Sequence, residues 1–91
     1  MSLENFKTQL ELMLEIPFEV LEYQFQNFAF GSGLIAYRIK GHNIKFVFDG
    51  RDNWLRVYKS DLHEKYPTTN WHEIHSQAGL ELSNAQIRSF V

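Results

Sequence analysis

Between Leu34 and Lys59, apolar and polar residues alternate in three short runs that are separated by two turn-like segments. Successive side chains of a β-strand point to opposite faces of its sheet, so such runs predict strands with one buried face. We expect strands over residues 34–40, 44–49 and 54–59. A shift of one residue in their pairing would turn every side chain to the other face, so the requirement that apolar residues share a face constrains the register.

The first of these hairpins is predicted to turn through a two-residue loop at residues 41–42, where the leading glycine suits a type II′ turn. This register sets Tyr37 opposite Phe46 on an apolar face. It also sets Arg38 opposite Lys45 on the other face. Like charges in direct opposition are unfavourable, so the pair suggests that an anionic group lies nearby.

The strands on either side of this hairpin follow from the same face argument. A four-residue loop at residues 50–53 joins the second and third runs in register. Residues 18–25 fit either a helix or a strand, and we favour a strand over residues 22–30, with a bulge near residues 26–27 where the alternation changes parity. A turn at residues 32–33 would then make this the first strand of a four-stranded meander.

A helix is predicted at the start of the chain. Ser2 is a suitable N-cap, and Pro17 disfavours helical geometry just before it, so the helix should end near Glu15. Its apolar residues recur at helical spacing and would face the sheet: Leu3, Phe6, Leu10, Met13 and Leu14.

Two capping patterns predict short helices near the end of the chain. Asn70 with Glu73 forms the first pattern, and its helix is expected to end at Gly79. Ser83 with Gln86 forms the second. Together the elements predict one α+β domain over residues 1–91: an N-terminal helix, a four-stranded antiparallel meander, and one or two short C-terminal helices packed on the sheet. Which face of the sheet those last helices cover stays open.

Composition and charge narrow the function classes. The chain has no cysteine, which excludes disulfides, thiolate metal sites and thiol nucleophiles, and suits a reducing, cytoplasmic location. No apolar run approaches the roughly 20 residues of a membrane-spanning helix, so we expect no membrane association. Residues 1–30 carry a net charge of −4 and residues 31–65 carry +3. This asymmetry indicates either an acidic partner or neutralisation within the fold, and we favour neutralisation.

The polar face of the meander is the first candidate binding surface. Cations beside aromatic rings are the combination with which single-stranded nucleic acids are bound. The candidate residues on this face are Arg38, Lys40, Lys45, Trp54, Arg56 and Tyr58. Basic residues are also common on exposed strands, where they discourage aggregation, and a pI near 6.0 is low for a nucleic-acid-binding domain.

The histidines offer a weak alternative site. His72 and His75 would share a face of the first C-terminal helix, with Glu73 between them, and two histidines with a carboxylate suit zinc or iron. Their spacing is one residue short of the H-E-x-x-H zinc motif. We therefore predict no metal, no cofactor and, since no catalytic motif is present, no enzymatic activity.

The leading hypothesis is a small non-catalytic protein-binding module that recognises a protein partner or a second copy of itself. The two outer strands of the meander would have unpaired edges, and such edges accept a partner strand. Tyrosine and tryptophan, the residue types that dominate protein interfaces, are available beside them as Trp54, Tyr58, Tyr66 and Trp71. Binding of an anion or a nucleic acid at the basic face is the alternative.

Overall fold

The computed structural model describes the backbone of all 91 residues and every side chain except that of Asn27. The chain forms an α+β fold with one antiparallel sheet of five strands in the order β1-β2-β3-β4-β5. Its elements are α1 (Leu3–Met13), β1 (Phe18–Gln26), a 3-10 turn η1 (Asn27–Ala29), β2 (Ser32–Ile39), β3 (His42–Asp49), β4 (Trp54–Ser60), β5 (Trp71–Ala78) and α2 (Asn84–Phe90). Neither α1 nor α2 has the length and apolar character that a membrane span requires.

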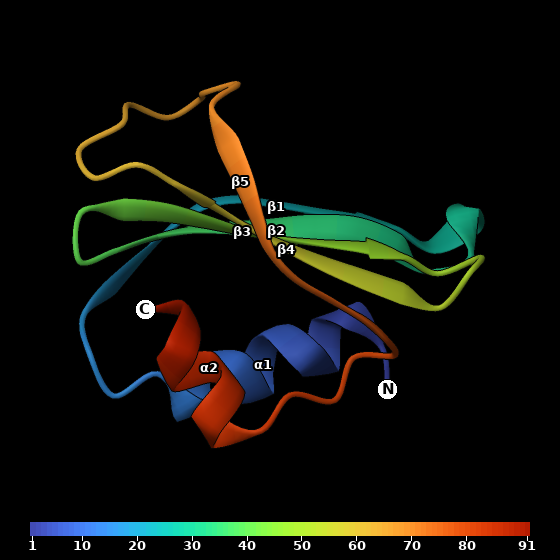
Figure 1. The fold of residues 1–91 in the computed structure, drawn as a ribbon. Coiled ribbons are helices and arrows are strands. Elements are labelled where there is room, and N and C mark those ends of the chain that lie inside the picture. The colour runs from blue at the N-terminus through green and yellow to red at the C-terminus, as the bar shows by residue number, and fades with distance from the viewer.

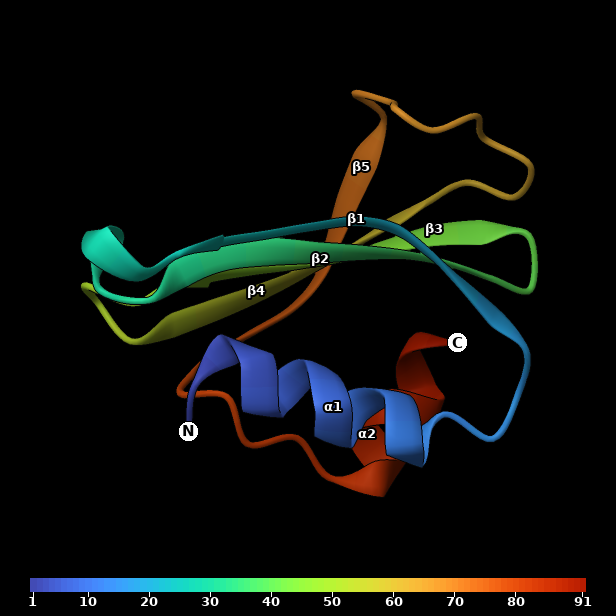
Figure 2. The same ribbon diagram turned by 180° about the vertical axis from the view of Figure 1, so that it is seen from behind.

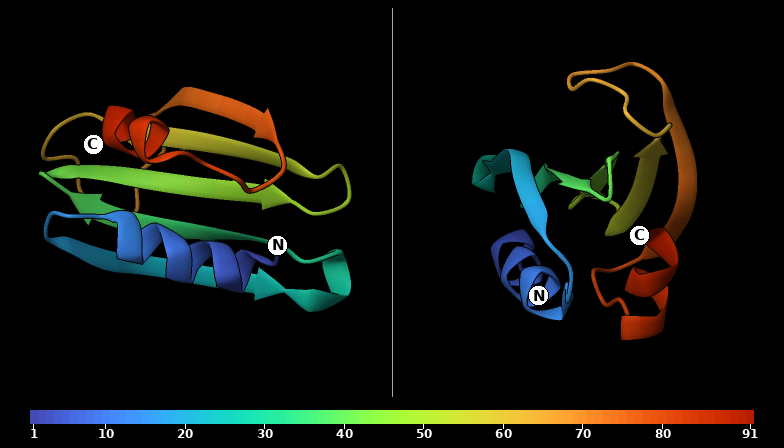
Figure 3. Two further views of the ribbon diagram at one scale, coloured as in Figure 1. Left: turned by 90° about the horizontal axis from the view of Figure 1, so that it is seen from below. Right: turned by 90° about the vertical axis from the view of Figure 1, so that its left-hand side faces the viewer.

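Both helices cover the same face of the sheet, while the loop of residues 61–70 rises on the other side (Figures 1 and 2). When the sheet is viewed from the side of the helices, α1 lies in front of β1 and β2, and α2 lies in front of β3 and β4 (Figure 3). We call the face under the helices the inner face and the opposite one the outer face. The question left open by the sequence is thereby answered, since α2 covers the face opposite to that of Arg38, Lys45 and Arg56.

The first helix matches its prediction closely. Ser2 caps it by accepting a hydrogen bond from the backbone N–H of Asn5 at 3.1 Å. The helix buries Leu3, Phe6 and Leu10, and it ends at Met13, two residues before the predicted end. On its flank, Lys7 and Glu11 form an ion pair of 2.7 Å.

The core lies between these helices and the inner face. Tyr37 and Phe46 lie on this face with their rings 6.0 Å apart at an edge-to-face angle, and Phe6 of α1 packs on Phe46 at 5.8 Å. The Tyr37 hydroxyl reaches α1 and donates a hydrogen bond of 2.9 Å to Glu11. Fully burying an apolar side chain of this size contributes about 1.5–3 kcal/mol. The buried members of the core, taken from the sheet, both helices and the segment before α2, are Leu3, Phe6, Leu10, Ile35, Tyr37, Ile39, Ile44, Phe46, Phe48, Leu55, Val57, Leu80, Ile87 and Phe90.

The β2–β3 hairpin keeps the predicted faces but not the predicted register. Its turn residues are Lys40 and Gly41, with φ values of 53° and 80°, instead of residues 41–42. Positive φ at both positions is typical of a type I′ turn, whose twist matches that of the strands. The pairing is displaced by two residues, so Tyr37 lies opposite Ile44 and not opposite Phe46.

The strands next to this hairpin show one success and one error. The β3–β4 register is as predicted, with Phe46 opposite Val57. The first strand was placed too late, because β1 spans residues 18–26 and its bulge lies between Val20 and Glu22. The predicted helical alternative for this segment is therefore also wrong. Gly33 permits the close approach of β1, since a Cβ at this position would lie 2.1 Å from the Gln24 carbonyl oxygen.

The segment predicted as a helix from Asn70 to Gly79 is instead the fifth strand, β5. It pairs antiparallel with β4, with a register irregularity between Val57 and Tyr58 on β4. Hydrogen bonding to a neighbouring strand has outweighed the local capping pattern. The second capping prediction is confirmed, because Ser83 and Gln86 form a reciprocal capping box at the start of α2.

Candidate binding surfaces

The predicted opposition of Arg38 and Lys45 does not exist. Both side chains lie on the outer face, but Arg38 lies opposite Asn43, and Lys45 lies opposite Ala36. Across the other edge of β3, Lys45 lies opposite Tyr58, as predicted. The two-residue displacement at the hairpin therefore removes the like-charge pair that suggested an external anion.

Lys45 has partners within the fold. Its Nζ lies 4.4 Å from the centre of the Trp71 ring and 5.1 Å from that of Tyr58, which are cation–π distances. Partial burial lowers the pKa of Lys45, while the nearby carboxylate of Glu22 acts in the opposite direction. A cation that contacts two aromatic rings of its own fold is not an open phosphate ligand.

The loop of residues 61–70 reaches across the outer face to β1. The Tyr66 hydroxyl donates a hydrogen bond to Glu22, and the Tyr66 and Trp71 rings meet edge to face at 6.5 Å. Burial, together with this hydrogen bond to a carboxylate, raises the pKa of Tyr66 to about 12. The acidic β1 thus neutralises part of the basic face from within the sheet, and the acidic helix α1 lies on the opposite side.

The remaining candidates of the basic face are dispersed. Arg56 pairs with Glu73 of β5 at 3.5 Å, with both side chains about half exposed. Trp54 lies at the far end of β4 opposite Asp49. Lys40 belongs to the β2–β3 turn and lines a different pocket. The six predicted residues do not form one continuous site.

Arg38 borders a small basic hollow at the base of the 61–70 loop. Its guanidinium donates two hydrogen bonds of 3.3 Å to the side-chain oxygen of Asn43, whose own amide donates to the Glu64 carbonyl at 2.8 Å. The hollow has a volume of about 200 Å³, and it is also lined by Gly41, His63, Glu64 and Lys65.

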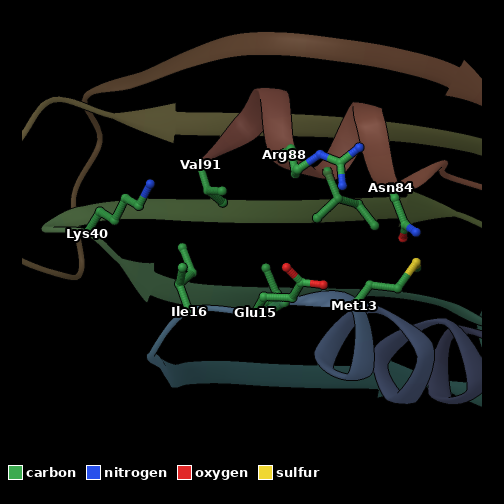
Figure 4. Close-up of a pocket in the computed structure, with 9 residues that line it drawn as sticks. Met13, Glu15, Ile16, Lys40, Asn84, Arg88 and Val91 are labelled. Atoms are coloured by element: carbon green, nitrogen blue, oxygen red, sulfur yellow. The ribbon is translucent and has the colours of Figure 1, made fainter.

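A second pocket opens between the end of α1, α2 and the β2–β3 turn (Figure 4). Lys40, Arg88 and Glu15 supply its charged groups, and apolar side chains such as Ile16 and Val91 line the rest. Its volume is about 240 Å³, whereas small-molecule sites usually measure roughly 300–1,000 Å³. The pocket is therefore small for an organic ligand.

The two histidines of the metal hypothesis lie on β5, not on a helix, and have different partners. His72 Nε2 lies 3.2 Å from an Asp61 carboxylate oxygen at the exposed end of the strand. His75 packs its ring against that of Phe90, with centroids 5.4 Å apart, and its Nε2 lies 2.9 Å from Gln77 Oε1. Among the described side chains, no three His, Asp or Glu residues are grouped closely enough to hold a metal ion.

Five of the exposed large apolar residues lie on β1 and in the turn that follows it. Three side chains on the inner face of this strand are about 40% exposed, and two phenylalanines in the following turn are 91% and 69% exposed. We call these five residues the β1 strip: Val20, Tyr23, Phe25, Phe28 and Phe30. The sequence did not reveal this surface, because the alternation of Phe28 and Phe30 predicts a strand that faces the core.

The opposite edge of the sheet has a different character. β5 has a single exposed large apolar residue, Ile74, and its other exposed side chains are polar apart from the small Ala78. The strand also swings steeply away from its neighbours (Figures 1 and 2). Steep twist and polar side chains both hinder the addition of another strand, so β1 is the better candidate for an interface.

Comparison of this chain with known protein families, with characterised proteins and with solved structures finds no match.

Proposed function

We propose that this protein is a non-catalytic protein-binding module that receives an extended segment of a protein at β1. The observation that carries this proposal is the β1 strip beside an unpaired strand edge. Apolar side chains on exposed edges are normally avoided because they template aggregation. Their retention along one edge, while the other edge is polar, favours a binding role.

The edge defines the chemistry of the partner. An added strand would satisfy the unpaired backbone N–H and C=O groups of β1, and its side chains would meet those of β1 on both faces. On the inner face it would contact Tyr23 and Phe25, which calls for apolar residues at alternate positions. On the outer face it would meet Glu19 and Glu22, which calls for neutral or basic residues and excludes acidic ones.

A peptide library tests this proposal without a known partner. We expect the wild-type protein to select phage-displayed peptides with alternating apolar residues. The double variant Tyr23→Glu/Phe25→Glu should select none of them, since both apolar contacts are replaced by charge. The control Ile74→Glu, with a similar change on β5, should select the same peptides as wild type. Selection that is equal for all three proteins contradicts the proposal, and so does the absence of selection by wild-type protein that is monomeric.

The second candidate function is anion or nucleic-acid binding at the Arg38 hollow. It is favoured by the guanidinium of Arg38, which Asn43 holds in place and which forms no ion pair within the part of the chain that the structure describes. It is weakened by Glu19, which lies opposite Arg38 on β1, and by the internal partners of Lys45.

Salt-dependent binding tests this second candidate. A labelled single-stranded oligonucleotide should bind the wild-type protein with an affinity that falls as salt rises. The variant Arg38→Ala/Lys65→Ala should bind more weakly, whereas the exposed control Arg51→Ala should not. Equal affinity of all three proteins removes the hollow from consideration. For both candidate functions, the cytoplasmic location that the absence of cysteine suggests is still a prediction.

A further inference from the structure

The regular part of β1 reads almost the same in both directions. The bulge between Val20 and Glu22 bounds it at one end, and η1 bounds it at the other. The five residues between these limits are Glu-Tyr-Gln-Phe-Gln, from Glu22 to Gln26. Polar residues occupy the two ends and the centre, and aromatic residues occupy the two positions between them. A strand with this symmetry is suited to antiparallel pairing with its own copy.

Only one two-fold register uses the whole regular segment. Residues in direct opposition share a face, so the axis must pass through a residue and not between two residues. An axis at Gln24 pairs all five residues from Glu22 to Gln26. An axis at Tyr23 or at Phe25 leaves three regular residues paired, since the bulge or η1 then interrupts the ladder.

The side chains brought together in the Gln24 register are complementary. On the inner face, Tyr23 lies opposite Phe25 of the partner subunit, and the two-fold axis repeats this aromatic pair. On the outer face, Glu22 lies opposite Gln26 of the partner subunit, whose amide can donate to the carboxylate. Two Gln24 amides meet on the axis. This register therefore avoids opposing carboxylates, which are unfavourable across strands.

The arrangement of the domain leaves this edge accessible. β1 is the outermost strand, and no element lies beyond it (Figure 3). Glu22 is already held on the outer face by Tyr66 and Gln24. The exposed aromatic side chains beside the edge, including Phe28 of η1, would be withdrawn from water by the second copy.

We infer that the occupant of the β1 edge is a second copy of this chain, paired antiparallel about a two-fold axis at Gln24 so that two sheets become one continuous sheet. This inference rests on the proposed function and names the partner of the same surface. The contact is isologous, meaning that each copy contributes the same residues.

Oligomeric state tests the inference first. Analytical ultracentrifugation of the wild-type protein should give a concentration-dependent dimer. Phe25→Glu should raise the dissociation constant at least about tenfold, because it replaces a central aromatic anchor by a charge. The control Ile74→Glu should leave the dissociation constant unchanged. A monomer at every concentration, or the same constant in both variants, overturns the inference.

A second variant guards against misfolding of Phe25→Glu. Gln24 is exposed, so Gln24→Glu is expected to fold normally, as circular dichroism can verify. In the dimer this change sets two carboxylates against each other on the axis and should also weaken association, by about two- to fivefold. Unchanged association of a folded Gln24→Glu variant contradicts the proposed axis.

Engineered cysteines test the register directly, because the natural chain has none. Residues on the axis face their own copies at the short Cα distances that a disulfide bridges. Gln24→Cys should therefore form a covalent dimer under mild oxidation. Gln26→Cys should not, since four residues of strand separate it from its copy by roughly 13 Å. Failure of Gln24→Cys to cross-link, or equal cross-linking of both variants, rules out this register.

The association and peptide-selection experiments together distinguish failure of this inference from failure of the proposed function. A protein that stays monomeric but selects peptides through Tyr23 and Phe25 retains the proposed function and refutes self-pairing. A protein that neither dimerises nor selects peptides refutes both. A dimer that dissociates with Phe25→Glu and cross-links through Gln24→Cys supports both.

Discussion

The two edge strands of this sheet, β1 and β5, differ in the side chains that they expose to solvent. β5 twists steeply away from the other strands and exposes mainly polar side chains, with Ile74 as its one large apolar exception. β1 runs alongside β2, and the only charged side chains along it are those of Glu19 and Glu22, both acidic. Its neighbouring aromatic residues are left exposed.

This difference shows that edge protection is not uniform within one small sheet. A polar and twisted strand needs no covering element, because an added strand gains little from it. An apolar edge does gain from another strand. The proposed partner would cover the exposed aromatic residues of β1, which do not belong to the core between the sheet and the two helices.

The largest expected loss of stability comes from separating β1 from the sheet. Gly33→Ala would place a Cβ 2.1 Å from the Gln24 carbonyl oxygen and 2.7 Å from a Leu3 methyl group. We expect the free energy of unfolding to fall by about 3 kcal/mol, since backbone atoms must move to relieve the overlap. Urea denaturation measures this loss. The exposed control Ser76→Ala on β5 should change stability by less than about 0.5 kcal/mol, and an equal loss in both variants would contradict the proposed close approach.

A smaller loss of stability is expected when Lys45 on the outer face is replaced. Lys45→Ala removes cation–π contacts with Trp71 and Tyr58 and leaves Glu22 without its nearby cation. We expect a loss of about 1–2 kcal/mol, measured by the same denaturation assay. Lys65→Ala, an exposed lysine in the adjacent loop, serves as the control. A similar small effect for both lysines would show that the internal partners of Lys45 contribute nothing.

The contact from the 61–70 loop to β1 predicts a pH dependence. The pKa of Tyr66 is raised from 10.0 to about 12, so the folded state holds this proton more tightly than the unfolded state. The stabilisation is complete below pH 10.0 and is lost as the pH rises toward about 12. Tyr66→Phe should reduce the alkaline loss of stability, leaving the part due to Tyr37, whose pKa is raised further by burial beside Glu11. Identical alkaline profiles of the two proteins would contradict this contact.

The smallest effect is expected beyond the end of β1. Phe28 is 91% exposed, so Phe28→Ser removes apolar surface without opening the core. The free energy of unfolding should change by less than about 0.5 kcal/mol. Thermal denaturation at a concentration where the protein is monomeric measures it. A large loss would show that Phe28 packs within the monomer and does not belong to the exposed strip.

Face and register differ in how well the sequence predicts them. The alternation of Tyr37, Phe46 and Val57 fixes which side chains point inward, and all three are buried. Moving a two-residue turn from 41–42 to 40–41 shifts the strand pairing by two residues. Alternation also repeats every two residues, so both turns place the same side chains on the inner face and the pattern cannot distinguish them. The turn that forms places Lys40 in the left-handed conformation, which few non-glycine residues adopt, so the sequence provided no reason to expect it.

Elements that depend on long-range pairing were the least predictable. Asn70 and Glu73 have the spacing of a helix cap, yet the segment after them completes the sheet beside β4. Phe28 and Phe30 resemble strand residues but lie in the turn around η1. The candidate interface was missed for the same reason, because its exposure depends on where β1 ends. Short-range signals with local partners, such as the caps at Ser2 and Ser83, were predicted correctly.

The turn at Lys40 and Gly41 offers a way to obtain a more heat-tolerant background for these experiments. Asparagine adopts the left-handed conformation more readily than lysine, and Asn-Gly is the preferred pair of a type I′ turn. Lys40→Asn should therefore raise the melting temperature while leaving both outer strands untouched. In that background, a disruptive substitution such as Gly33→Ala would retain enough folded protein for its association to be measured.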